Sequence, residues 1–551
     1  MRPNKSSNMK PILILKNGNI LTMDASGAKA QAVAVASDGR ILAVGSESEI
    51  GNLANAGTRC IDLNGRTLIP GFFDCHLHIL WLGINLGHVN LASPPVKDKE
   101  DIVRLLRQRR DEQPELTCLQ GNRYDQNKLP EGKHLTREDL DRVATDIPVR
   151  IVHTSGHAAV VNSRALEMLG ISAETPDPVG GEIERGAKGA PTGVLLETAS
   201  WNDLDRILPE VTPEAAMEAL GRANRYLLER GITSSTDANT LPADITTYSR
   251  AVEANLLQTR TNLMVGWAEV VRQVGSGAVP TPAMLQPLGA NGHRLHVGQA
   301  KLFSDGAITT RTCWLTDPFQ GMPDNFGIPI HPPEELRDLI LKAHNAGWQI
   351  ATHAIGDRAV DLVLSAYAEA QRQNSRHRPD HRIEHCMLLD NDLIARLRRQ
   401  HVWSIGQPEF IAGLGDAYVT ALGEERAERL SPYATLDDRG VAQAFSSDCP
   451  VVPGAPLAGM RAAIERKTPQ GRILNAAERL SPDAALYAYT AAPAFATRTE
   501  RDRGSLEAGK WADFTLLSAD PLTTPADAWD GLSVMAAFVG GECLYGQETL
   551  E

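Results

Sequence analysis

Two histidines stand two residues apart in the segment FFDCHLH, directly after Pro70-Gly71. Successive side chains of a β-strand point to opposite faces, so we expect the imidazoles of His76 and His78 on the same face of one strand. Neutral imidazole is a common metal ligand, and two of them from one strand supply half of a zinc site. The alternative is that both are surface or core histidines without a ligand.

Four further polar residues stand at or near the end of an apolar segment that we predict to be a strand. Lys301 lies in VGQAKLFSDG, His353 ends WQIATH, His385 ends RIEH, and Asp448 ends VAQAFSSD. Each alone has a structural explanation, such as an ion pair, a loop cap, a core hydrogen bond or a helix cap. Four such coincidences, added to the histidine pair, explain the pattern less well than one metal site.

The segments that carry these residues alternate between predicted helices and strands. Thr212 followed by Pro213 begins a helix that ends near Gly231, and the strand ITSSTD follows at once. The pattern repeats in HPPEELRDLILKAHNAG with WQIATH, and in DNDLIARLRRQ with VWSIGQ. Strands that alternate with helices predict a parallel sheet, open or closed. In a (β/α)8 barrel the carboxyl ends of the strands meet at one mouth, where catalytic groups lie.

We therefore predict an α/β fold with a (β/α)8 TIM-like barrel over residues 71–494. This region exceeds the roughly 250 residues of a typical barrel, so we expect a large insertion at about 85–200, where Asp, Gly and Pro cluster. Residues 1–70 and 495–551 instead contain short alternating segments, several of them separated by Asn-Gly or Asp-Gly turns. Neither end has enough strands for a stable sheet pair, so we expect both to form one composite β-sandwich domain.

Composition limits the class of protein. The 551 residues are 42% hydrophobic and 22% charged, which is typical of a globular chain and excludes a disordered one. The net charge of −13 disfavours nucleic acid as a partner, and no stretch reaches the roughly 18 apolar residues of a membrane span. The polar start MRPNKSSNMK does not resemble a signal peptide, and the seven cysteines form no CxxC pair. Both features favour a cytoplasmic protein.

The order of the candidate ligands resembles that of the amidohydrolase superfamily, with HxH on the first strand, then Lys, His, His and Asp on strands four, five, six and eight. The finer resemblance is to its YtcJ-like branch, which includes N-substituted formamide deformylases, and it extends from about residue 11 to 546. The stretches that carry it are LIPGFFDCHLH, HAAVVNSRAL, GGEIERGAKGAPTGVLLE, KLFSDGAI, ATHAIGD, RIEHC, FSSDCPV and GSLEAGKWADF. The chain departs from the branch near GNRYDQNKL, where Asn122 and Arg123 replace small or aromatic residues.

The resemblance implies a metal centre. The implied ligands of one or two divalent ions are His76, His78, Lys301, His353, His385 and Asp448. Zn²⁺ is the expected metal because the site is rich in nitrogen. Metal-activated water would attack a carbonyl group, with Asp448 as general base and then acid. A cationic Lys301 would repel a metal, so we expect it to be carboxylated to a carbamate that can bridge two ions; an ion pair with Asp305 is the alternative.

Four residues are candidates for contact with a small-molecule substrate. They are Arg123, His157, Asp305 and Trp314. His157, in TSGHAAVVNSRAL, could contact the substrate carbonyl or its tetrahedral oxyanion and so have a catalytic role, and a structural hydrogen bond is the alternative. For Asp305 and Trp314 the alternative is ordinary loop packing. Asp74 could orient a metal ligand, because it shares a strand face with His76.

The predicted function is metal-dependent hydrolysis of a non-peptide C–N bond, with N-substituted formamides as one candidate class. Esters, lactones and carbamates stay open, because the same chemistry attacks their carbonyl groups. A deaminase is disfavoured: such relatives carry a Glu shortly after the strand-five His and lack the strand-four Lys, whereas Ala-Ile-Gly-Asp follows His353 here. A non-catalytic scaffold should have lost ligands, and all six are present. Base rate and resemblance both favour a homodimer.

Overall fold

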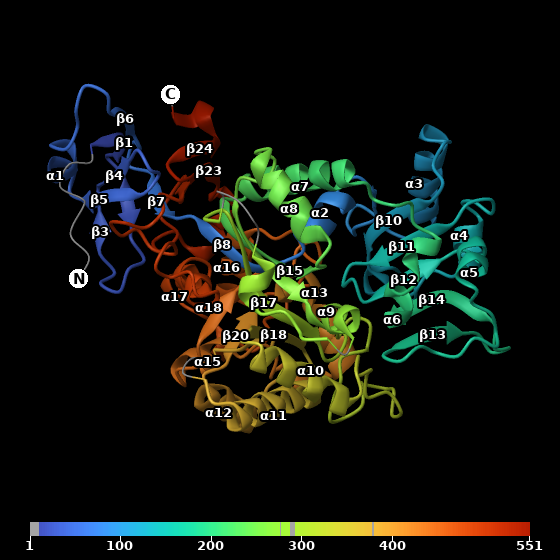
Figure 1. Ribbon diagram of the computed structural model, residues 1–551. Helices are drawn as coiled ribbons and strands as arrows, with labels where there is room; N and C mark the ends of the chain where they lie inside the picture. Colours follow the sequence, from blue (N-terminus) through green and yellow to red (C-terminus); the bar gives the residue numbers. More distant parts are fainter. Residues whose placement is uncertain (1–9, 276, 287–291, 377–379, 551) are drawn as a thin grey trace.

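A computed structural model describes residues 10–275, 277–286, 292–376 and 380–550. Residues 1–9 and Glu551, the outer limits of the predicted composite domain, lie outside the described residues. Figure 1 shows a central barrel with a separate sheet on one side and strands from both chain ends on the other. Among the described residues, no helix has the length and apolar character needed to cross a bilayer.

Eight parallel strands form the centre of the molecule. In order around the sheet they are β8 (Phe72–Leu77), β15 (Ile232–Thr240), β16 (Arg260–Gly266), β17 (Leu295–Phe303), β18 (Gln349–Ala354), β19 (Arg382–His385), β20 (Trp403–Gly406) and β21 (Gln443–Phe445). The segment after β21 returns to β8: the Asp448 amide donates to the His76 carbonyl, and the His78 amide donates to the Cys449 carbonyl, each at 2.8 Å. This nearly closed barrel confirms the predicted fold class.

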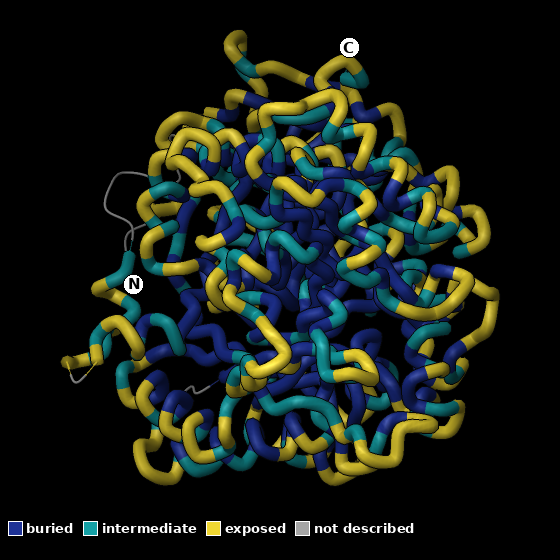
Figure 2. The backbone as a smooth tube through the Cα atoms, turned by 90° about the vertical axis from the view of Figure 1, so that its right-hand side faces the viewer, coloured by how far each residue is buried: buried dark blue, intermediate teal, exposed yellow. Residues whose placement is uncertain are grey.

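Helices between the strands cover the outside of the barrel. They include α7 (Pro213–Leu228), α8 (Asp244–Glu253), α9 (Trp267–Val274), α10 (Pro333–Asn345), α11 (Asp357–Gln373), α12 (Asn391–Gln400) and α13 (Glu409–Leu422). The α7 helix begins as predicted, with the Thr212 hydroxyl accepting from the Ala215 amide at 3.2 Å and Pro213 in the first position. Figure 2 shows that the buried residues are concentrated in the centre of the molecule, where helices and barrel share one large apolar core.

Strands from the two ends of the chain pack together beside the barrel. One sheet has the order β5 (Ile41–Gly45), β4 (Ala32–Ala36), β1 (Pro11–Lys16), β6 (Arg59–Asp62). The other has the order β24 (Glu542–Tyr545), β23 (Val534–Val539), β22 (Phe514–Leu517), β7 (Thr67–Pro70), β2 (Asn19–Leu21), β3 (Lys29–Ala30). Apolar side chains of both sheets, such as Leu15 and Phe514, share one core. This is the expected β-sandwich; its limits at residues 70 and 495 stay a prediction.

The long segment between β8 and β15 forms a mixed six-stranded sheet. Its order is β13 (Gly181–Arg185), β14 (Pro191–Glu197), β12 (Ala158–Val161), β11 (Val149–His153), β10 (Leu119–Tyr124), β9 (Val89–Asn90). Helices α3 (Lys99–Glu112), α4 (Arg137–Asp141) and α5 (Ser163–Leu169) accompany it. The Asp, Gly and Pro clusters that predicted an insertion lie between these elements, so the insertion is a folded sheet rather than a set of long loops.

Candidate active site

Histidines from three barrel strands surround the carboxylate of Asp448. Its Oδ1 atom lies 3.4 Å from Nε2 of His76 and 3.1 Å from Nε2 of His78. His76, His385 and Asp448 offer ligand atoms that all lie within 4.8 Å of one another. The ring centroids of His353 and His385 are 4.4 Å apart. The four predicted histidines and Asp448 therefore meet at the carboxyl ends of their strands.

Two of these imidazoles already use one ring nitrogen as a hydrogen-bond donor. Nδ1 of His76 lies 2.5 Å from Oε2 of Glu384, and Nδ1 of His385 lies 2.9 Å from Oε1 of Gln407. Both partner oxygens only accept, so each Nδ1 carries the hydrogen and each Nε2 keeps a lone pair. Oδ1 of Asp448 is buried and accepts no hydrogen bond in the described structure. Lone pairs gathered around an unpaired carboxylate oxygen fit a divalent metal ion.

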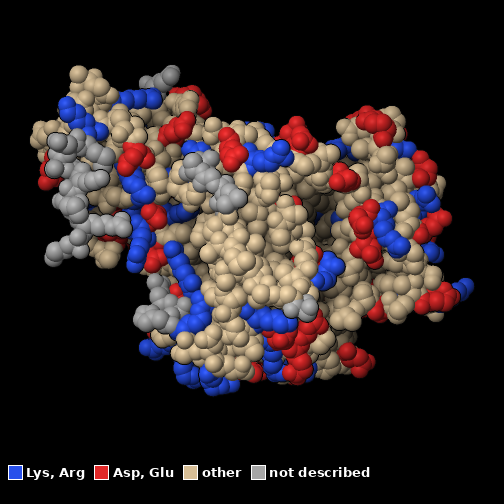
Figure 3. Space-filling model, in the orientation of Figure 1, with Lys and Arg blue, Asp and Glu red and all other residues tan. Residues whose placement is uncertain are grey.

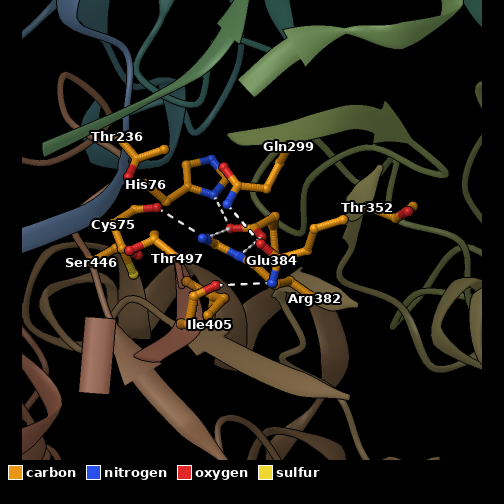
Figure 4. A network of polar contacts seen from close by, with 12 residues as sticks. Cys75, His76, Thr236, Gln299, Thr352, Arg382, Glu384, Ile405, Ser446 and Thr497 are labelled. Atoms are coloured by element: carbon orange, nitrogen blue, oxygen red, sulfur yellow. Dashed lines mark hydrogen bonds and ion pairs between the residues drawn. The ribbon is translucent and has the colours of Figure 1, made fainter. Parts of the chain in front are cut away.

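Glu384 is held between His76 and Arg382, as Figure 4 shows. The Arg382 guanidinium donates to both carboxylate oxygens, at 2.8 and 2.9 Å, and also to the Cys75 carbonyl at 2.9 Å. Burial alone would raise the pKa of Glu384, but Arg382 and His76 hold it far below its usual value. This ion pair was not among the sequence-based predictions, although Arg382 and Glu384 stand two residues apart on one strand and therefore share a face.

Lys301 lies on β17, the fourth barrel strand, and is almost completely buried. Its Nζ atom has no hydrogen-bond partner among the described residues and lies 4.7 Å from the centroid of the Phe303 ring. Burial lowers the pKa of Lys301 to about 8, although the nearby carboxylates of Glu384 and Asp448 act in the opposite direction. Within the described chain it forms no ion pair with Asp305, which was the alternative reading of this lysine.

Asp305 faces the backbone of the neighbouring loops. Its carboxylate accepts hydrogen bonds of 2.8 to 3.1 Å from the amides of Trp314, Ile355 and Gly356. Its Oδ1 atom also lies 3.5 Å from Nε2 of His353, which donates to the Gly306 carbonyl at 3.1 Å. Burial raises the pKa of Asp305 to about 7. Asp305 therefore positions the loops and the ring of His353, whose Nδ1 keeps its lone pair.

His157, from the insertion sheet, reaches the same cluster. Its ring centroid lies 5.0 Å from that of His353 and 5.5 Å from that of Trp201. Its Nδ1 atom lies 2.7 Å from Oε2 of Glu197, which is completely buried and has a left-handed φ of 48°. Burial alone would lower the pKa of His157, but Glu197 outweighs it and raises that pKa. Glu197 is a second residue that the sequence analysis missed, and no spacing pattern connects it to His157.

Asp74 joins the strand that carries His76 to the loop that carries Asp448. Its Oδ1 atom accepts from the amides of His76 and Ser447, at 3.3 and 3.1 Å, and its Oδ2 atom accepts from the Ser447 hydroxyl. Burial raises the pKa of Asp74 to about 6. Asp448 itself has a left-handed φ of 59°, which is unfavourable for a residue with a side chain. The hydrogen bonds from Ser447 to Asp74 hold the preceding residue and so help to keep the Asp448 carboxylate in place.

The two other candidates, Trp314 and Arg123, contact other parts of the chain. The indole of Trp314 is partly exposed and packs under the guanidinium of Arg358, 4.4 Å from the ring centroid. Arg123, on β10, lines a cavity together with Asn85 and Cys449. In the described part of the chain, no hydrogen bond or ring contact joins either residue to the histidines.

Several known proteins are similar to this chain in sequence and fold. The chain matches the amidohydrolase family over residues 59–545. YtcJ of Bacillus subtilis (strain 168), which carries an amidohydrolase name, is 32% identical over 541 residues, covering 97% of this chain and 99% of that protein. N-substituted formamide deformylase of Arthrobacter pascens is 30% identical over 546 residues, covering 98% of each. An uncharacterized metal-dependent hydrolase from Pyrococcus horikoshii superimposes with a TM-score of 0.74 at 27% identity, covering 94% of this chain and 99% of that one.

Proposed function

The chain belongs to the amidohydrolase family, whose members include metal-dependent hydrolases, and from that premise we propose that it cleaves a non-peptide carbon–nitrogen bond. N-substituted formamides are the first candidate substrates, since a relative with 30% identity over nearly the whole chain is named for that reaction. The observation that carries the proposal is the unpaired Oδ1 atom of Asp448 between the Nε2 atoms of His76 and His78.

The residues that would hold one or two divalent ions are His76, His78, His353, His385 and Asp448. Zn²⁺ suits this set, because neutral imidazoles with a free lone pair dominate it. When bound, such an ion supplies a Lewis acid for the scissile carbonyl and lowers the pKa of water to about 7.

Asp448 is the proposed proton carrier of the reaction. Its buried Oδ1 atom lies 3.4 and 3.1 Å from the Nε2 atoms of His76 and His78 and accepts no hydrogen bond among the described residues. It can therefore accept the proton of the attacking water and deliver it to the leaving nitrogen, as a general base and then a general acid.

His157 would stabilise the charge that develops on the substrate oxygen. Glu197 fixes its ring through Nδ1, which leaves Nε2 free to donate a hydrogen bond. A donor that is oriented before the reaction stabilises an oxyanion without any cost of reorganisation during the reaction.

We also propose that Lys301 is carboxylated. Its neutral amine would attack CO2, forming an N–C bond and releasing one proton, and the product is an anionic carbamate. Two features support this: Nζ is buried without a hydrogen-bond partner among the described residues, and a pKa of about 8 leaves about a tenth of the amine uncharged at pH 7, far more than in an exposed lysine. The carbamate would add an anionic oxygen donor to the five residues that would hold the metal.

A matched panel tests the proposed function. N-benzylformamide, N-benzylacetamide, benzyl formate and a simple lactone are assayed before chelation, after chelation and after readdition of Zn²⁺. We expect metal-dependent release of formate and amine from the formamide. Turnover of the ester or the lactone alone would replace the amide assignment, and a folded, metal-free chain that is inert to all four would favour a scaffold. Asp448→Asn should retain metal and lose turnover. The control Asp438→Asn, at the exposed end of α15 (Tyr433–Asp438), should retain both metal and turnover.

A further inference from the structure

A cavity of about 190 Å³ lies between the barrel and the insertion sheet. Its walls come from α2 (Ile79–Asn85), β10, α7 and the loop after Asp448. The lining includes Asn85, His88, Arg123, Tyr226 and Cys449, and it contains no Asp or Glu in the described chain. Since His78 directly precedes α2 and Asp448 directly precedes Cys449, this cavity adjoins the proposed site along two segments of the chain.

The backbone places Arg123 at this wall by an irregular strand geometry. In the pairing of β10 with β11, Asn122 lies opposite Val152 and Tyr124 lies opposite His153, so Arg123 is the extra residue of a β-bulge. Its φ of 68° is left-handed, a conformation that is unfavourable for a residue with a side chain. Bulges of this kind re-aim a side chain next to functional sites.

Arg123 and Asn85 both present hydrogen-bond donors that lack acceptors. In the described structure, the Arg123 guanidinium makes no ion pair or hydrogen bond, and its Nε atom is buried. Nδ2 of Asn85 is likewise buried without a partner, although the Asn85 backbone carbonyl accepts from the Asn122 side chain at 3.0 Å. A buried donor without an acceptor destabilises the folded protein, so two of them at one cavity indicate that an acceptor binds there.

Several arginines lie near the His88 side of the cavity. Burial lowers the pKa of His88 to about 4, and the guanidinium groups of Arg150, Arg109 and Arg222 act in the same direction. On the face seen in Figure 3, by contrast, basic and acidic side chains are interspersed. A cavity with several nearby arginines, two unsatisfied donors and no lining acid favours an anionic ligand.

We propose that this cavity binds a carboxylate group of the substrate, so that the preferred substrates are amides with an acidic arm. This inference rests on the proposed function, because it places the acidic group beside Cys449 and the scissile bond toward Asp448. The planar fork of the Arg123 guanidinium matches the two oxygens of a carboxylate, and Asn85 Nδ2 supplies a third donor. A volume of this size suits a carboxylate on a short carbon chain.

N-formylglycine and N-formylglycinamide provide a matched pair, since they differ only in the charge of one group. We expect the holoenzyme to release formate from the acid with a kcat/KM at least about tenfold higher, as a charge-assisted hydrogen bond of roughly 1.5 kcal/mol or more implies. Arg123→Gln should bring this ratio near one. Arg337→Gln, which removes the same charge from a surface pair with Glu334 on α10, should keep the ratio.

Asn85→Asp is a nearly isosteric second variant, and it should reverse the preference by placing an anion at the cavity wall. A ratio near one in the wild type, or a ratio that survives both Arg123→Gln and Asn85→Asp, overturns the proposal. If the holoenzyme cleaves neither formyl compound nor N-benzylformamide, the proposed function has failed. Whenever the two formyl compounds are not cleaved, ¹⁹F line broadening of trifluoroacetate by the holoenzyme still tests the anion site. Broadening should disappear in Arg123→Gln but not in Arg337→Gln. Trifluoroacetate that binds without competing with N-formylglycine would overturn the assignment to the substrate.

Discussion

Nδ1 of His76, on the first strand of the barrel, lies 2.5 Å from Oε2 of Glu384, on the sixth. The contact joins residues that are 308 positions apart in the sequence. It fixes which nitrogen of His76 carries the hydrogen and therefore which one is left for a metal ion. Arg382 keeps Glu384 charged, so the orientation of His76, a proposed metal ligand, depends on a buried ion pair behind it.

Replacing Glu384 by Gln should lower the affinity for the metal about 10- to 100-fold, because Nδ1 of His76 loses its charged partner. The change also leaves Arg382 without a counter-ion in a fully buried position, which lowers the free energy of unfolding by about 3–5 kcal/mol.

The double variant Glu384→Gln with Arg382→Met removes both charges, and it provides a variant whose metal affinity can be measured without an unpaired buried charge. Competition with a chelator measures affinity, and thermal unfolding monitors the fold. Wild-type affinity in a folded double variant would contradict the role given to Glu384.

The carbamate of Lys301 should be visible by ¹³C NMR after incubation with ¹³C-bicarbonate. CO2 reacts with the neutral amine, and a pKa of about 8 makes roughly half of the amine neutral at pH 8, so the signal should increase from pH 6 to pH 8. Lys301→Met should abolish the signal and lower the number of metal ions per chain. Lys342→Met, which breaks only an exposed ion pair with Asp338, should preserve both. No signal at any pH in this range would count against carboxylation.

His157→Asn should reduce kcat about 100-fold, which is typical for the loss of one oriented oxyanion donor. Glu197→Gln should have a smaller effect in the same direction, since the imidazole stays but is held less firmly. Metal content should be unchanged in both variants, and His331→Asn, on a surface pair with Glu335, is the matched control. An increase in KM at unchanged kcat would instead assign His157 to ground-state binding.

Glu409 should make the stability of the protein depend on pH. It is 6% exposed, it accepts from the amides of Gly454 and Ala455, and burial raises its pKa to about 7. A carboxyl group with a raised folded-state pKa contributes stability below its unfolded pKa and loses that contribution as the pH rises through about 7.

Glu409→Gln removes this titration while keeping an acceptor for both amides. The melting temperature of the variant, relative to wild type, should therefore rise between pH 5 and pH 8, with an upper limit of about 3 kcal/mol in the difference of unfolding free energies. Glu424→Gln, at a surface pair with Arg472, should show no such trend. Parallel pH profiles of wild type and Glu409→Gln would disprove the effect.

The sequence alone predicted the barrel and the approximate ligand set for a simple reason. Residues such as His353 follow apolar strands, and the end of a barrel strand is a local feature that can be read from hydrophobic spacing. The comparisons confirm the family resemblance and the fold class. The hydrogen-bond partners of the site histidines could not be predicted. Glu384 contacts His76, and Glu197 contacts His157, only after distant segments of the chain have folded together.

Left-handed backbone conformations account for another part of what could not be predicted. Strand alternation would place Glu384 and His385 on opposite faces, yet His385 has a φ of 74° and its ring lies in the same cluster. Neither His385 nor Arg123 is a glycine, so nothing in their residue types signals the turn that aims them. Such positions are held by tertiary packing and are invisible to patterns of propensity.

The place of β7 between β2 and β22 has a consequence for biosynthesis. β7 leads directly into the strand that carries His76, but one of its two neighbours begins at Phe514. A nascent chain that ends before residue 448 contains the four histidines of the proposed metal site but lacks the Asp448 carboxylate that lies beside them. One paused before codon 514 would leave an open strand edge on β7. The proposed metal site can therefore be completed only late in translation, after most of the polypeptide has been synthesised.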